Sequence, residues 1–91
     1  MKTEAGLDYD GFMPTVMRID GFRIVIWPDD HVPAHVHVYR AGGEVVIFLE
    51  QVRIRERKGM SIRDSSLARD VVAAIRKTLL NQWRQWIDDQ R

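Results

Sequence analysis

The hydrophobic and polar positions in the first third of the chain follow the pattern of paired strands. Residues 15–19 and 22–27 are rich in β-branched and aromatic side chains, which are favoured in strands. Between them lies an Asp-Gly pair, the residue combination typical of a type I′ turn. We therefore predict a β-hairpin over residues 15–27, followed by an ordered, irregular connection over residues 28–34, where two prolines disfavour a helix.

A second hairpin is predicted by strict alternation further along the chain. Residues 35–40 read His-Val-His-Val-Tyr-Arg, and residues 44–50 continue as a largely apolar run beyond an Ala-Gly-Gly turn. Residues 52–55 then alternate Val and Ile with two arginines, a pattern typical of a short edge strand whose charges discourage edge-to-edge association. The alternation typical of a strand ends at Gly59.

The last third of the chain has helical periodicity. Ser61 or Ser65 is the predicted N-cap, and the apolar residues beyond them recur at steps of three and four. The stripe comprises Leu67, Val71, Val72, Ile75, Leu79, Trp83 and Trp86. We predict an α+β fold: a small antiparallel sheet of two hairpins plus a short edge strand, packed against one long C-terminal amphipathic helix. Residues 13–91 form this single domain, and residues 1–12 are an N-terminal extension, poorly ordered or lightly docked.

Composition narrows the class of protein. The 91 residues are 45% hydrophobic and 30% charged, as in ordinary globular domains, and the formal net charge of +1 gives no overall attraction to nucleic acid. The absence of cysteine excludes disulfides and thiolate metal sites and favours a cytoplasmic protein. Neither an export signal nor a membrane segment is indicated, and nucleotide-binding motifs are absent, so no organic cofactor is expected.

Candidate chemistry is concentrated in residues 29–37, which hold all three histidines of the chain beside two aspartates. The period of two places His35 and His37 on one face of a strand, with Tyr39 one step further and Glu44 across the hairpin. Three interpretations stay open. The imidazoles could hydrogen-bond loop carboxylates and fix the connection; they could bind a divalent zinc, nickel or iron ion together with His31 or Asp30; or they could perform acid-base chemistry on a phosphodiester, with Asp30 orienting one ring.

Two further features are candidates for binding. Arg53 and Arg55 lie in a basic run that either contacts RNA phosphates or forms a solvated edge strand, and Glu56 within the run favours the second interpretation. Trp83 is expected in the core, whereas Trp86, nearer the end of the helix, is the candidate contact for a partner.

Specific segments of the chain resemble a small bacterial family known as domain of unknown function 4160. They are Met-Pro-Thr-Val-Met-Arg-Ile at 13–19, Gly-Phe-Arg at 21–23, Asp-Asp-His-Val-Pro-Ala-His-Val-His-Val at 29–38, and a terminal helix containing Trp83. The family's members typically begin near Met-Pro-Thr and have a more proline-rich histidine motif than the single Pro33 found here. The resemblance implies a module like those of toxin-antitoxin pairs, encoded beside a second small protein, and it supplies no catalytic residues.

We therefore expect a small cytoplasmic protein-interaction module, one component of a toxin-antitoxin-like pair that binds a cognate protein encoded nearby. The alternatives are a ribonuclease-like toxin that uses His35 and His37, with Arg53 or Arg55 on the phosphate, and a metal-binding regulatory domain. Whether the protein is an enzyme stays open, as do RNA binding, homo-oligomer formation and a divalent metal. No membrane partner is expected.

Overall fold

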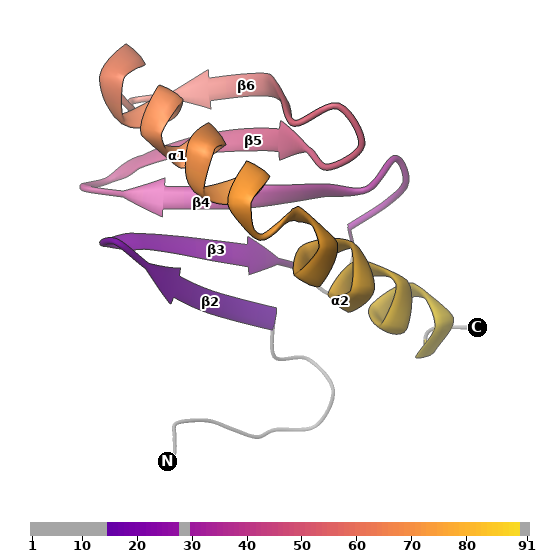
Figure 1. The fold of residues 1–91 in the computed structure, drawn as a ribbon. Coiled ribbons are helices and arrows are strands. Elements are labelled where there is room, and N and C mark those ends of the chain that lie inside the picture. Colours follow the sequence, from indigo (N-terminus) through magenta and orange to yellow (C-terminus); the bar gives the residue numbers. More distant parts are fainter. Residues whose placement is uncertain (1–14, 28–29, 90–91) are drawn as a thin grey trace.

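The computed structural model describes residues 15–27 and 30–89 (Figure 1). The extension predicted over residues 1–12 lies outside the described residues. In the described part, five strands form one antiparallel sheet in which every strand pairs with the next along the chain. The strands are β2 (Thr15–Ile19), β3 (Phe22–Ile26), β4 (His35–Arg40), β5 (Gly43–Phe48) and β6 (Arg53–Lys58).

The β2–β3 and β4–β5 hairpins belong to one continuous sheet, because β3 pairs with β4. The predicted turn between β2 and β3 is present: Asp20 and Gly21 have φ angles of 52° and 80°, the left-handed geometry that a type I′ turn requires. The turn between β4 and β5 repeats this geometry at Ala41 and Gly42. β6 forms the edge of the sheet opposite β2 and is six residues long.

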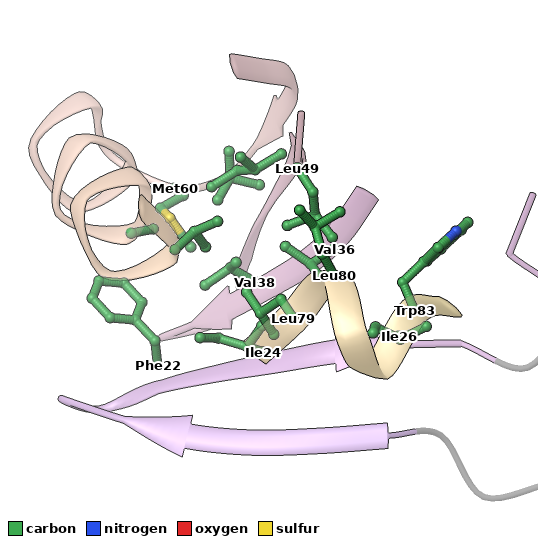
Figure 2. Close-up of a cluster of buried hydrophobic side chains, with 14 residues drawn as sticks. Phe22, Ile24, Ile26, Val36, Val38, Leu49, Met60, Leu79, Leu80 and Trp83 are labelled. Atoms are coloured by element: carbon green, nitrogen blue, oxygen red, sulfur yellow. The ribbon is translucent and has the colours of Figure 1, made fainter. Parts of the chain in front are cut away.

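Alternation along β4 sets the two faces of the sheet. Val36 and Val38 are fully buried on the face covered by both helices (Figure 1). Side chains from the sheet and both helices meet there in one hydrophobic core, in which Trp83 is also buried (Figure 2). Fully burying a side chain of this size stabilises the fold by about 1.5–3 kcal/mol, so this core fixes which side of β4 faces inward. His35, His37 and Tyr39 therefore project from the opposite side, which we term the histidine face.

The prediction of one long helix is wrong, because the helical region consists of α1 (Ile62–Ala74) and α2 (Arg76–Asp89). Ile75 between them has φ −116° and ψ 22°, and its N–H is shared between two carbonyls of the preceding turn. Immediately afterwards, Arg76 Nε donates to the Leu49 carbonyl oxygen at 2.7 Å, tying the junction to the end of β5. The apolar stripe runs across a break of a single residue without losing its spacing, so periodicity alone did not reveal it.

Among the described helices, neither is long and apolar enough to cross a membrane.

Candidate metal centre

The Asp30 carboxylate is positioned by the turn that follows β3. The Trp27 N–H donates to Asp30 Oδ2 at 2.8 Å, and the Asp30 N–H donates back to the Trp27 carbonyl at 3.1 Å. Aspartate is well suited to this place, because its short side chain can accept from a nearby backbone N–H. The turn occupies Oδ2 and leaves Oδ1 directed at the first residues of β4.

His35 stands at the start of β4 and has only 8% of its surface exposed. Its Nδ1 donates to the Pro33 carbonyl oxygen at 2.8 Å. A carbonyl can only accept, so the Nδ1 atom carries the proton, and in the neutral ring Nε2 has a lone pair. That Nε2 lies 3.4 Å from Asp30 Oδ1, while the Trp83 ring packs nearby with a centroid separation of 5.3 Å.

His37 has carboxylates at both ring nitrogens. Its Nδ1 lies 2.8 Å from Glu44 Oε2, and its Nε2 lies 3.2 Å from Asp30 Oδ1. A neutral imidazole has one proton and can donate to only one of these carboxylates. With the proton on Nδ1, the shorter contact is a hydrogen bond to Glu44, and the Nε2 lone pair faces Asp30.

Asp30, His35 and His37 thus form a compact cluster, in which one donor atom from each side chain lies within 4.8 Å of the others. Lone pairs of two imidazoles facing a carboxylate oxygen repel one another unless a cation lies among them, either a proton or a metal ion. Ligands held tetrahedrally about 2.0–2.1 Å from an ion lie roughly 3.3 Å apart. The Nε2 atoms of His37 and His35 lie 3.2 and 3.4 Å from Asp30 Oδ1, which matches this spacing.

A hollow of about 420 Å³ adjoins the cluster. Its walls come from the β3–β4 connection, β4, β5 and β6, and they comprise Asp30, His31, Val32, Pro33, His35, His37, Phe48 and Arg55. Its size falls within the range of small-molecule sites, roughly 300–1,000 Å³. The cluster is therefore adjacent to a space that a ligand can enter.

The residues predicted from sequence are distributed unevenly around this site. His31 lines the hollow but is exposed, and its ring does not belong to the set of converging donor atoms found among the described residues. Arg55 lines the hollow, whereas Arg53 stacks over the Phe48 ring, with its guanidinium carbon 4.9 Å from the ring centroid. The side chain of Trp86 lies outside the described residues, so its predicted role is untested.

The rest of the basic run is engaged locally. Arg57 Nη1 donates to the Met60 carbonyl at 2.7 Å, and Lys58 pairs with Glu56 at 3.1 Å. Of the three arginines of β6, Arg55 therefore lines the hollow, and Arg53 contacts Phe48 in its wall.

Tyr39 and Trp27 extend the polar network beyond the cluster. The Trp27 indole N–H donates to the Tyr39 hydroxyl at 3.0 Å. Burial raises the pKa of Tyr39, and the Glu44 carboxylate adds to this, while the Trp27 hydrogen bond and Arg23 act in the opposite direction. The phenol is thus kept protonated beside Glu44. Sequence reasoning missed Trp27 and the Pro33 carbonyl, since only the backbone path of the loop shows where these groups point.

The fold and the site together define a class: a small α+β domain with an antiparallel meander sheet and a histidine-aspartate cluster on its histidine face. The family model for a domain of unknown function (DUF4160) matches residues 21–84, and the chain belongs to this family. No curated protein and no solved structure matches the chain. The matched region contains the whole cluster and its hydrogen-bond partners.

Proposed function

We propose that this domain binds one divalent transition-metal ion through Asp30 Oδ1, His35 Nε2 and His37 Nε2. One observation carries the proposal: both histidines have their Nδ1 atoms held by acceptors, so that both Nε2 atoms face the same carboxylate oxygen. Histidines that ligate metals almost always donate their other ring N–H to a carboxylate or a backbone carbonyl. Glu44 and the Pro33 carbonyl supply these two acceptors.

The donor set also favours a class of ion. Imidazole and carboxylate ligands together suit zinc, iron and nickel, whereas calcium and magnesium prefer oxygen ligands alone. Three protein ligands leave coordination positions for water or a substrate, as in catalytic rather than structural zinc sites. Those positions would face the hollow beside the cluster.

Calorimetric titration of the full untagged chain with zinc tests the proposal directly. We expect about one equivalent of zinc per chain in the wild type, and roughly a tenth or less in Asp30→Asn. The asparagine can still accept from the Trp27 N–H, so the turn is retained, while its amide nitrogen takes the place of the ligating oxygen.

His31→Ala is the matched control, because His31 lies in the same loop but outside the converging donor set. It should bind zinc as the wild type does. Wild-type protein that takes up less than roughly a tenth of an equivalent would refute the proposal, as would an Asp30→Asn variant with unchanged affinity.

A second proposal is that the domain is one half of a toxin-antitoxin-like pair and binds a small cognate protein encoded nearby. Two features support it: the resemblance of the chain to such modules and an apolar groove of about 470 Å³ between α1 and the β2–β3 hairpin. Leu67 lines this groove and is 41% exposed, and an apolar helix face of the cognate protein would cover it.

Co-expression with the neighbouring gene product tests the pairing. We expect a stable complex that Leu67→Asp disrupts and that the exposed Ile62→Asp leaves intact. A domain that purifies as a monomer without the co-expressed protein would argue against this function.

A further inference from the structure

We infer that the hollow beside the cluster binds the phosphate group of a phosphate ester, with Arg55 as the anion-binding side chain and the metal ion as the second contact. This inference rests on the metal proposed above and extends it by naming a ligand class. It is carried by the placement of Arg55, the charges around the hollow and the nature of its walls.

Arg55 reaches the hollow because of an irregularity in β6. Val46 pairs with Glu56 and Ile47 pairs with Ile54, so Arg55 is an extra residue with no partner on β5. Such a β-bulge redirects a side chain and is over-represented near active sites. Here it directs an arginine toward the hollow that contains Asp30 and His37.

Within the part of the chain that the structure describes, no carboxylate pairs with Arg55. Its planar guanidinium group matches two oxygens of a phosphate with parallel hydrogen bonds. Lys58 and Arg40, by contrast, already face carboxylates.

The balance of charge makes anion binding depend on the metal. Without an ion, the carboxylate of Asp30 offsets the guanidinium of Arg55 among the residues that line the hollow. With a divalent ion on the cluster, positive charge exceeds negative charge around the hollow, and an anion can complete the coordination of the metal. A phosphate oxygen on the ion and a second oxygen on Arg55 would satisfy both groups.

The walls of the hollow favour an ester over a bare anion. Val32, Pro33 and Phe48 line it alongside the charged residues, and Val32 is 74% exposed. An organic group attached to the phosphate would cover these apolar surfaces, which inorganic phosphate leaves in water.

The test uses the full chain loaded with one equivalent of cobalt, whose visible absorption reports on its ligands, and phenyl phosphate as the probe. We expect phenyl phosphate to change the cobalt spectrum of the wild type, and Arg55→Ala to weaken its binding about tenfold or more while cobalt uptake is unchanged. Arg63→Ala is the matched control, since it removes the same charge from an exposed position on α1, and it should bind as the wild type does.

The outcomes of this test distinguish the metal proposal from the inference of phosphate binding. Wild-type protein that takes up no cobalt would overturn the metal proposal and this inference with it. Normal cobalt uptake with a spectrum that phenyl phosphate does not change would overturn this inference alone. Equal phenyl phosphate affinity in the wild type and Arg55→Ala would also overturn it, because the anion would then bind without the arginine.

Discussion

Two serines near the start of α1 show how position decides the role of a single hydroxyl group. Ser61 precedes the helix, and its Oγ accepts from the Asp64 N–H at 3.0 Å, so it is the N-cap. Ser65 lies one turn later and is buried, and its Oγ has no hydrogen-bond partner among the described residues. Both residues were candidates for the cap from sequence, and the structure selects Ser61.

We predict opposite effects of replacing these serines by alanine. Ser61→Ala should lower the free energy of unfolding by about 1 kcal/mol, because the Asp64 N–H loses its acceptor. Ser65→Ala should leave it unchanged or raise it by up to about 1 kcal/mol, because alanine removes an unsatisfied polar group and has the higher helix propensity. Urea denaturation measures both, and a larger loss for Ser65→Ala than for Ser61→Ala would contradict the assignment.

The candidate site could be predicted from sequence only as far as strand periodicity reaches. Alternation along β4 correctly placed the two histidines on one face, since Val36 between them and Val38 after them are buried on the other face. The third donor was left open between His31 and Asp30, because its position depends on a loop path fixed by hydrogen bonds to Trp27. Arg55 faces the hollow because of a β-bulge, and the hydrophobic pattern of the sequence does not reveal this bulge.

At the scale of strands and helices, Gly43 marks a close approach between two elements. A Cβ atom added there would lie 2.5 Å from the Gly59 carbonyl oxygen and 2.8 Å from Met60 Cα. The start of β5 therefore packs directly against the chain leaving β6. At Gly42, by contrast, a Cβ atom would meet nothing within 4 Å, although its φ of +80° favours glycine.

Alanine substitutions at these two glycines separate steric conflict from backbone strain. Gly43→Ala should destabilise the fold by about 2–3 kcal/mol, since backbone atoms must move to admit the methyl group. Gly42→Ala should cost only about 1 kcal/mol, the typical penalty for an alanine in left-handed geometry. Thermal and urea unfolding of both variants provide the measurement, and equal losses would show that the approach at Gly43 is looser than described.

Elements were predictable from sequence where local residues determine them. The Asp20-Gly21 turn formed as expected, because its residues tolerate the positive φ angles that a tight hairpin needs. The division between α1 and α2 was not predictable, because Ile75 is a normal member of the apolar stripe. The break between the two helices instead coincides with a contact between residues far apart in the sequence, in which Arg76 donates to the Leu49 carbonyl oxygen.

At the scale of the whole molecule, the cluster joins the connection between β3 and β4 to the neighbouring strands β4 and β5. Asp30 comes from the connection after β3, the two histidines come from β4, and Glu44 comes from β5. A metal ion on the cluster would therefore hold the β3–β4 connection against the centre of the sheet. Its binding free energy adds to the stability of the folded state, since the unfolded chain does not assemble these donors.

We therefore predict that zinc stabilises the fold in proportion to its binding. At a free zinc concentration 100 times the dissociation constant, the gain is about 2.7 kcal/mol, which corresponds to a rise in Tm of about 10–20 °C for a domain of this size. Scanning calorimetry with and without zinc measures this shift.

Asp30→Asn should show no zinc-dependent rise and should keep at least the stability of the wild type without metal, because its amide nitrogen can donate to the Nε2 atoms that face the carboxylate. A zinc-dependent rise of equal size in both proteins would mean that the ion binds elsewhere, whereas an Asp30→Asn variant that fails to fold would mean that the carboxylate is needed to hold the loop even without a metal.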